Sequence, residues 1–251
     1  LKQPILVDGW RHAPELGGDV HTAALVAPDG SVQTHDKCRL LPYTEVVPGR
    51  RLLGIFGQGT VRAWEGFIEK FVGIVPQGVM GSIDDIKPFT LRGRDGREWR
   101  FGTPICFEIA TARVVNRWNR QGVDFLVNQT SEGRLGTSVH ETTITISGFR
   151  AIEGRVSVVR ATNEGISSLI DPNGRVREVL RGRYTGATTA EPGVFYPRVI
   201  IDSRRPTVYA RVGDAFAIAC LIGTAGLWIG ALVARRRSRR ERGPALAAAA
   251  P

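Results

Sequence analysis

The chain has 251 residues, 42% of them hydrophobic, and a formal net charge of +10. This length and apolar content are sufficient to bury the core of one α/β domain of about 200 residues. Half of the charge lies in residues 235–242, where six arginines and Glu241 give a net of +5. No basic stripe with interleaved aromatic residues remains outside this run, which argues against a nucleic-acid partner. The odd, sparse set of cysteines, Cys38, Cys106 and Cys220, argues against a disulfide framework.

Short apolar runs bounded by turn residues predict strands, and longer periodic segments between them predict helices. The expected strands are residues 4–7, 23–27, 99–105, 124–128, 156–161 and 166–170, and the expected helices are residues 111–119 and 138–152. Because the helices fall between strands, part of the sheet is expected to be parallel or mixed. The pattern therefore predicts an α/β layered fold.

The first chemically suggestive segment is THDKCRLLPYTEVVPG, in which Lys37 precedes an apolar pair, a proline and an acid, Glu45. An ammonium group stabilises a nearby thiolate and the oxyanion that forms when this thiolate attacks a carbonyl. The spacing alone is also compatible with a solvated surface lysine. We interpret the neighbouring Cys38 as a small packing residue, because a disulfide between it and Cys106 would block the nucleophile proposed below.

Residues 52–97 form a long insert with several aromatic side chains, including Phe56, Trp64, Phe67 and Phe71. One interpretation is a loop that folds back onto the domain, with these side chains as a local core. The other is a lid or arm that lies in the membrane interface, where Trp and Phe are well tolerated, and that lets a lipid tail reach the site. The sequence leaves both open, since long inserts in compact domains are usually functional or disordered.

Cys106, in TPICFEIA, follows the apolar end of the expected strand at 99–105 and precedes the expected helix at 111–119. A thiol at the point where a buried strand turns toward a helix is rigidly held yet reachable, which suits a nucleophile. An acid, Glu108, lies two residues further on. Free cysteines are also among the most buried side chains, so this segment alone is compatible with a core residue.

Residues 215–234 carry no charge and are followed at once by RRRSRRERG. At ~1.5 Å rise per residue this span can cross a hydrocarbon core of ~30 Å, so we expect a transmembrane helix. A buried core helix fits poorly, because the span is apolar on every face. The positive-inside rule places the basic tail in the cytoplasm and the preceding domain on the opposite side of the membrane. The final GPALAAAAP is of low complexity and is expected to be disordered.

Four ordered segments resemble the nitrilase superfamily and, within it, the apolipoprotein N-acyltransferases of bacterial envelopes. Residues 37–45, KCRLLPYTE, are similar to the family's Lys-x-His-Leu-Val-Pro-Phe-Gly-Glu, and residues 105–108, ICFE, to its Ile-Cys-Tyr-Glu. Residues 149–176 are similar to its Arg-Ala-x-Glu and Arg-Ala-x-Asn-x-Gly-Ile-Ser segments, and residues 207–214 to the close of its catalytic domain. The family's Asn-Asp-x-Trp-Phe-Gly loop appears as residues 131–136, SEGRLG, with an arginine in place of a large aromatic.

The resemblance implies a nitrilase-like αββα sandwich, followed here by one transmembrane helix, and a Glu-Lys-Cys triad. In this triad Cys106 is the nucleophile, and Lys37 stabilises the oxyanion together with the backbone N–H of Phe107. Glu45 and Glu108 are implied as supporting acids that orient Lys37 or the incoming amine. No metal or organic cofactor is implied, because no His, Cys and carboxylate residues have ligand spacing.

The family's triad glutamate lies in its first strand-helix unit, whereas the opening PILVDGW resembles a later strand. We therefore expect the C-terminal portion of a longer protein, without this glutamate and the membrane helices that precede it. Glu15 is the only early alternative, and it sits in a Gly-rich turn. The expected division is an incomplete catalytic domain at 1–211, a transmembrane helix at 212–234 and a disordered basic tail at 235–251.

The function implied by the resemblance is acyl transfer at the bacterial inner membrane, with the catalytic domain in the periplasm and the C-terminus in the cytoplasm. The acyl donor is a phospholipid, the acceptor is the N-terminal amine of a diacylglyceryl-cysteine in an apolipoprotein, and a Cys106 thioester is the intermediate. Two alternatives remain: a carbon–nitrogen hydrolase of a small amide or nitrile, and an inactive membrane-anchored remnant. The uncharged span and the aromatic insert favour a lipid substrate over a small amide.

Overall fold

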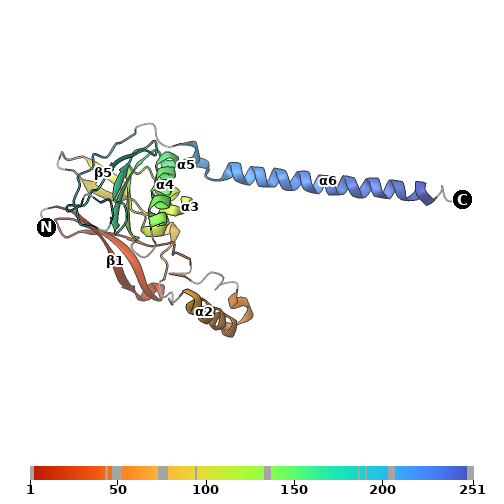
Figure 1. Ribbon diagram of the computed structural model, residues 1–251, viewed down its shortest axis with the longest axis horizontal. Helices are drawn as coiled ribbons and strands as arrows, with labels where there is room; N and C mark the ends of the chain where they lie inside the picture. Colours follow the sequence, from red (N-terminus) through yellow and green to blue (C-terminus); the bar gives the residue numbers. More distant parts are fainter. Residues whose placement is uncertain are drawn as a thin grey trace. The chain divides into compact units, whose positions relative to one another are not determined.

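The computed structural model describes residues 3–42, 45–46, 53–72, 79–93, 95–132, 137–185, 187–189, 191–202 and 207–247 (Figure 1). The chain divides into two compact units, residues 1–211 and residues 212–251. The described strands all lie in the first unit, and one long helix dominates the second.

The regular elements alternate between strands and helices in the middle of the chain. The strands are Ile5–Ala13 (β1), Gly18–Val26 (β2), Val32–Asp36 (β3), Phe89–Arg92 (β4), Glu98–Gly102 (β5), Phe125–Ser131 (β6), Ser157–Asn163 (β7), Ser168–Ile170 (β8) and Val176–Val179 (β9). The α-helices are Gln58–Val72 (α2), Ala112–Arg120 (α3), Thr137–Gly154 (α4), Val208–Val212 (α5) and Ala215–Ala247 (α6). Short 3₁₀ turns include Pro14–Leu16 (η1) and Cys106–Ala110 (η4).

The strands form two sheets. β1, β2 and β3 make an antiparallel sheet, and β4 to β9 make a mixed sheet in chain order. Within the second sheet β5, β6 and β7 run parallel. Parallel neighbours need a crossover, which α3 supplies between β5 and β6 and α4 between β6 and β7. The register of β6 and β7 sets Asn128 directly beside Arg160, and this pairing brings two polar residues together inside the sheet.

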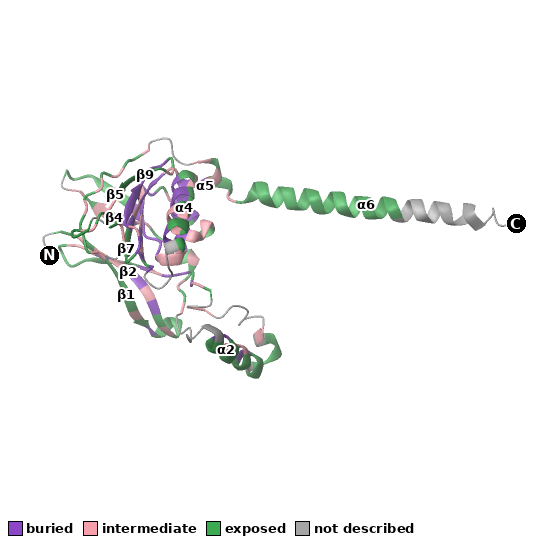
Figure 2. Ribbon diagram, in the orientation of Figure 1, coloured by how far each residue is buried: buried purple, intermediate pink, exposed green. Residues whose placement is uncertain are grey.

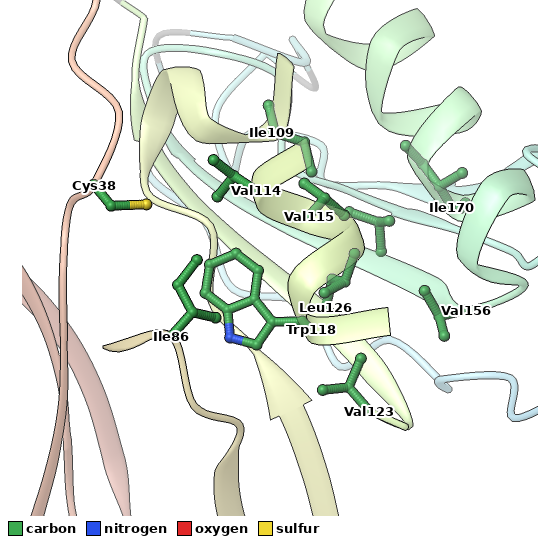
Figure 3. Close-up of a cluster of buried hydrophobic side chains, with 12 residues drawn as sticks. Cys38, Ile86, Ile109, Val114, Val115, Trp118, Val123, Leu126, Val156 and Ile170 are labelled. Atoms are coloured by element: carbon green, nitrogen blue, oxygen red, sulfur yellow. The ribbon is translucent and has the colours of Figure 1, made fainter. Parts of the chain in front are cut away.

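An apolar cluster fills the space between the helices and the six-stranded sheet (Figure 3). Trp118 and Val114 of α3 pack with Leu126 of β6 and Val158 of β7, and Ala151 of α4 belongs to the same cluster. Each large side chain of this kind contributes about 1.5–3 kcal/mol when it is fully buried. The buried residues of Figure 2 follow the strands and the helix faces that meet here.

A second apolar cluster joins the two sheets. Leu25 of β2 packs with Phe89 of β4 and Phe101 of β5, and Leu6 of β1 lies against them. The rings of Phe89 and Phe101 meet edge to face with centroids 5.5 Å apart. The described residues therefore form three successive layers: α3 with α4, the six-stranded sheet, and the three-stranded sheet.

This architecture confirms the expected nitrilase-like α/β fold. The six expected strands correspond to β1, β2, β5, β6, β7 and β8, and the two expected helices to α3 and α4. The expectation missed β3, β4 and β9. These strands are short and contain several polar residues, and such segments pair only because a neighbouring strand offers them an edge.

Helix α2 lies inside the long insert, for which no regular structure was expected. Val61, Trp64 and Ile68 recur at the spacing of one helical face, and the first and last of them are buried. Phe67 is half-exposed and stacks on Trp64 with ring centroids 5.4 Å apart. The insert is thus partly an amphipathic helix.

The last helix also differs from expectation. α6 continues to Ala247, through most of the segment expected to be a disordered tail. Arginine is a strong helix former, so a helix that begins in the apolar span extends readily through residues 235–242. Helix propensity does not explain why it continues past Gly243 and Pro244. The apolar segment Ala215–Arg235 has a mean hydropathy of 2.2 and buries none of its residues within the described chain (Figure 2).

Candidate active site

Cys106 is the first residue of η4, on the segment that leaves β5. The preceding Ile105 makes a parallel bridge with Gln129 of β6, so sheet pairing holds the approach to the turn. The φ of Cys106 is 49°, in the left-handed region, which costs a non-glycine residue roughly 1–3 kcal/mol. Such a conformation persists only where the surroundings impose it. The thiol is half-buried, so it is held in place but can still be reached.

Lys37 follows directly after β3, and its side chain is fully buried. Its Nζ donates to both carboxylate oxygens of Glu45, at 2.6 and 2.8 Å. Glu45 is only partly buried and also accepts a hydrogen bond from the N–H of Leu41 at 2.6 Å. This burial excludes the alternative of a solvated surface lysine. An ammonium has three donors, so among the described contacts one remains beyond the two that Glu45 accepts.

Glu108 is fully buried and joins the segment after β3 to the turn at the cysteine. One of its oxygens accepts the N–H of Cys38 at 2.6 Å, and the other accepts the N–H of Ile105 at 2.8 Å. The Nε2 of His35 lies 3.0 Å from this second oxygen. A single carboxylate therefore holds both the residue after the lysine and the residue before the cysteine.

The charge state of Glu108 follows from these contacts. Burial acts to raise its pKa, but the hydrogen bond and charge of His35, together with the two backbone N–H groups, outweigh burial and lower the pKa below its ordinary value. Glu108 is consequently ionised at neutral pH. Of the two acids expected to orient Lys37 or the incoming amine, Glu45 bonds the Lys37 ammonium, whereas the described contacts of Glu108 are with His35 and two backbone N–H groups.

The structure also brings His35, Cys38 and Glu108 within 4.8 Å of one another, which their spacing in the sequence did not indicate. These residue types can bind a metal ion, but a cysteine ligand must first lose its proton. Burial and the negative charge of Glu108 raise the pKa of the Cys38 thiol. Because the Glu108 oxygens already accept N–H donors, hydrogen bonding accounts for the cluster.

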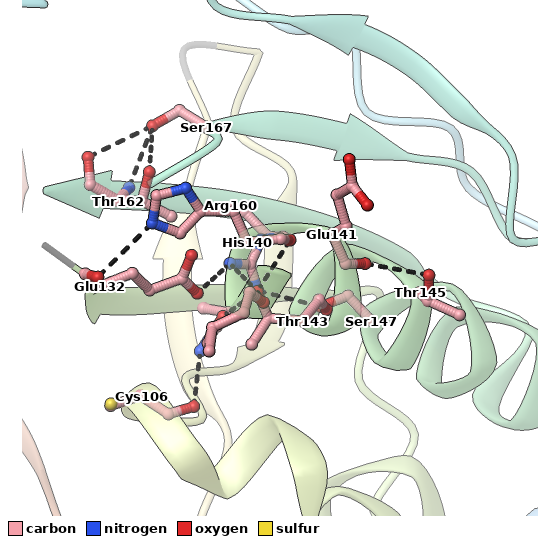
Figure 4. A network of polar contacts seen from close by, with 12 residues as sticks. Cys106, Glu132, His140, Glu141, Thr143, Thr145, Ser147, Arg160, Thr162 and Ser167 are labelled. Carbon is pink, nitrogen blue, oxygen red and sulfur yellow. Dashed lines mark hydrogen bonds and ion pairs between the residues drawn. The ribbon is translucent and has the colours of Figure 1, made fainter. Parts of the chain in front are cut away.

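A second buried ion pair lies between the six-stranded sheet and α4 (Figure 4). Arg160 of β7 is fully buried, and its Nη2 donates to Glu132 at 2.5 Å and to Thr143 at 3.2 Å. Its Nη1 donates to Asn128 at 2.9 Å and to Ser147 at 3.0 Å. The guanidinium is thus bonded from β6, from α4 and from Glu132, the residue that follows β6.

Asn128 connects this pair to the cysteine. Its Nδ2 donates to the carbonyl oxygen of Pro104 at 2.8 Å and, more weakly, to that of Cys106 at 3.4 Å. Figure 4 shows the Cys106 carbonyl oxygen on this network and the sulfur pointing away from it. The backbone is therefore held on one side while the thiol stays on the other.

The remaining expected positions can be placed as follows. Phe107 is the second residue of η4, so its N–H directly follows the cysteine. Glu15 is exposed in η1, and its carboxylate is bonded by Arg11 at 2.8 Å. Residues 43–44 of the lysine motif and residues 133–136, including Arg134, lie outside the described residues.

Sequence reasoning missed the roles of His35, Asn128 and Arg160. A signal was present for two of them, because Asn128 and Arg160 directly follow the short apolar runs FLV and VV of expected strands. A polar residue in a buried strand must find a partner there. No comparable pattern marked His35, which meets Glu108 only through the fold.

An open cavity of about 890 Å³ lies beyond the C-terminal ends of β6 and β7. Its lining includes Gln129, whose strand pairs with Ile105, together with Asn163 and three acids, Asp8, Glu164 and Glu191. Neither Cys106 nor Lys37 lines it.

Comparison with known proteins identifies the family. The family model described as carbon-nitrogen hydrolase matches residues 5–191, most of the chain. The chain therefore belongs to the carbon–nitrogen hydrolase family.

Its curated relatives form a narrower group. The chain is 31% identical to the apolipoprotein N-acyltransferase of Geobacter metallireducens, over 87% of this chain and 37% of that protein. It is 27% identical to apolipoprotein N-acyltransferase 1 of Treponema denticola, over 81% of this chain and 34% of the relative. It is 32% identical to the apolipoprotein N-acyltransferase of Bradyrhizobium diazoefficiens, over 94% of this chain and 40% of that protein. The motif-based resemblance is confirmed, and the chain spans about a third to two fifths of these relatives.

Proposed function

We propose that the protein is an N-acyltransferase of the bacterial inner membrane. It moves a fatty acyl group from a phospholipid to the N-terminal amine of a diacylglyceryl-cysteine in an apolipoprotein. The observation that carries the proposal is the Glu108 carboxylate, which holds the backbone beside the buried Lys37 and beside the half-buried Cys106. The names of the curated relatives support an acyl acceptor of this kind.

In the first half-reaction the Cys106 thiolate attacks the ester carbonyl of the phospholipid. The new C–S bond gives a tetrahedral oxyanion, which the free N–H of the Lys37 ammonium and the backbone N–H of Phe107 stabilise. Collapse of this intermediate breaks the ester C–O bond. The leaving alkoxide takes up the proton that a general base had removed from the Cys106 thiol, and it departs as a lysophospholipid, leaving an acyl-cysteine.

In the second half-reaction the amine of the acceptor attacks the thioester carbonyl. An amide C–N bond forms, the C–S bond breaks, and the Cys106 thiolate is regenerated. A general base must take the amine proton. Glu45 and Glu108 are engaged by Lys37 and by backbone N–H groups, so we assign this role, as the resemblance does, to a glutamate outside residues 1–251.

Two features suit a lipid substrate. The apolar first part of α6 is long enough to cross a bilayer, and its side chains are exposed in the described chain. Near α2, the apolar side chains of Ile55, Phe56 and Phe67 are exposed, as expected for an arm that lies in a membrane interface. A soluble amidase acting on a small amide would have no use for either feature.

The thioester is tested directly by incubating the protein, purified in detergent, with phospholipid. We expect a hydroxylamine-sensitive acyl adduct on the tryptic peptide of residues 101–113, in which Cys106 is the only cysteine. Cys106→Ser should lose the adduct, and Cys38→Ser serves as the matched control that should retain it. An adduct on Cys38, or full activity in Cys106→Ser, would contradict the assignment.

Membrane orientation provides the test against the small-amide hydrolase. The arginines after the apolar span are costly to translocate, so the C-terminus should lie in the cytoplasm. An alkaline phosphatase fused there should be inactive, and a fluorescent protein that matures only in the cytoplasm should glow. The reverse pattern would place Cys106 in the cytoplasm and make the hydrolase the better assignment.

A further inference from the structure

The buried pair of Arg160 and Glu132 takes no part in the chemistry above, although it lies immediately behind the cysteine. Both side chains are almost completely inaccessible to solvent. Removing two charges from water costs so much that a buried ion pair is often no more stable than an apolar pair of similar volume. Stability alone therefore gives little reason for this pair to stand in the core of the sheet.

The contacts of Asn128 show what the pair can influence. Because Arg160 donates to its Oδ1, the amide of Asn128 has only one sensible orientation, with Nδ2 directed at the backbone of Pro104 and Cys106. Those carbonyls flank a turn whose positive φ must be imposed by its surroundings. The guanidinium thus acts on the nucleophile through one intervening side chain.

The pair also affects the cysteine electrostatically. Burial lowers the pKa of the Arg160 guanidinium, while the negative charges of Glu132 and of a Cys106 thiolate act in the opposite direction. The attraction is mutual, so a positive guanidinium stabilises the thiolate. Glu132 partly cancels this effect, and its second oxygen, Oε2, has no hydrogen-bond partner in the described residues.

We propose that Arg160 and Glu132 form a positioning pair for Cys106, in which Arg160 holds the backbone of the turn through Asn128 and the guanidinium charge, partly offset by Glu132, acts on the sulfur. This inference rests on the proposed function in taking Cys106 as the nucleophile. Other ionisable groups also surround the turn from the packed elements. They are Glu108 of η4, His35 of β3, Lys37 and Glu45 after β3, and His140 of α4.

The pH dependence of Cys106 alkylation tests the proposal. Iodoacetamide is applied to the purified protein between pH 5 and pH 10, and the rate is read by mass spectrometry of the peptide of residues 101–113. Glu132→Gln keeps the shape of the side chain but leaves Arg160 uncompensated. We expect the midpoint of its alkylation profile to fall by roughly one pH unit, as for a thiol near an unbalanced positive charge.

Removing both charges should have the opposite effect. The alkylation midpoint of the double variant Arg160→Gln/Glu132→Gln should lie above that of Glu132→Gln by a similar amount. It should therefore equal or exceed the wild-type midpoint. Glu153→Gln is the matched control, because Glu153 forms another Arg–Glu pair, with Arg150 at 2.7 Å, and both of these residues lie on α4. It should leave the midpoint unchanged.

An unchanged alkylation midpoint in Glu132→Gln would overturn the proposal. A midpoint below the wild-type value in both Glu132→Gln and the double variant would also overturn it. If the double variant does not fold, the isosteric Glu132→Gln decides alone. Alkylation requires no lipid, so the two hypotheses fail separately. The expected shifts without any acyl adduct on Cys106 would refute the proposed function only, and an adduct with an unchanged midpoint would refute this inference only.

Discussion

Lys37 and Arg160 are both fully buried cations near the cysteine turn, but the fold surrounds them in different ways. Lys37 lies after a strand end and donates to one carboxylate, which is itself partly exposed. Arg160 lies within a strand and donates to four side chains, with a carboxylate partner that is also buried. Lys37 keeps one ammonium donor beyond the two that Glu45 accepts, which suits the proposed role in oxyanion stabilisation. The two terminal nitrogens of Arg160 are both engaged, and its Nε has no partner among the described residues, which suits the proposed positioning role.

Arg160→Ala is expected to have the largest effect on stability. The change leaves Glu132 as a buried charge without a partner, which typically costs about 3–5 kcal/mol. Chemical denaturation of the purified protein measures the loss. Arg160→Leu/Glu132→Leu should recover most of it, because the second charge is removed as well. If Arg160→Ala were as stable as the wild type, water would have to reach the site of the pair.

Lys37→Met should instead affect the rate more than the stability. Loss of one oxyanion-stabilising donor is worth roughly 10²–10³ in rate, while Glu45 is exposed enough to be hydrated when its partner is gone. Lys37→Arg should fail nearly as badly, because a planar fork cannot replace a compact ammonium. Acylation of Cys106 in a single turnover is the measurement. If a folded Lys37→Met protein kept most of its acylation activity, Lys37 would have no role in the mechanism.

Gly165→Ala tests how tightly the Arg160–Glu132 pair is packed. A Cβ at Gly165 would lie 2.5 Å from Oε2 of Glu132, whose other oxygen is fixed by Arg160. The side chain cannot retreat without losing this bond, so we expect a destabilisation of about 1–3 kcal/mol in thermal or chemical unfolding. Gly9→Ala, with nothing within 4 Å of the added carbon, should be nearly neutral. Equal stability of the two variants would mean that Glu132 is free to move.

The smallest of the effects concerns pH and the Glu108 clamp between the two segments. Its folded-state pKa is lowered, so Glu108 stabilises the folded protein at and above the pKa of about 4.3 that a free glutamate has. This contribution is lost as the pH falls through the lower, folded-state value. Glu108→Gln should therefore flatten the acid limb of the stability curve measured by denaturation. An acid limb with the wild-type slope would show that Glu108 does not contribute to it.

The candidate catalytic residues and most of the longer strands and helices could be predicted from local sequence. Cys106 and Lys37 were recognised from motifs that lie within single short segments. β6 and β7 could be predicted from their apolar runs FLV and VV, because buried parallel strands are rich in hydrophobic residues. The apolar span of α6 was equally clear, since its uncharged length is a local property.

The contacts between distant residues could not be predicted from local sequence. Glu108 and His35 are 73 residues apart in the sequence, and Arg160 and Asn128 are 32 apart, yet each pair is bonded. Such contacts depend on the register of neighbouring strands and on the packing of the two sheets, and a shift of one residue would turn these side chains to the opposite face. Local periodicity shows that a residue is buried. The hydrogen-bond or ion-pair partner that compensates a polar residue for its burial depends on the tertiary fold.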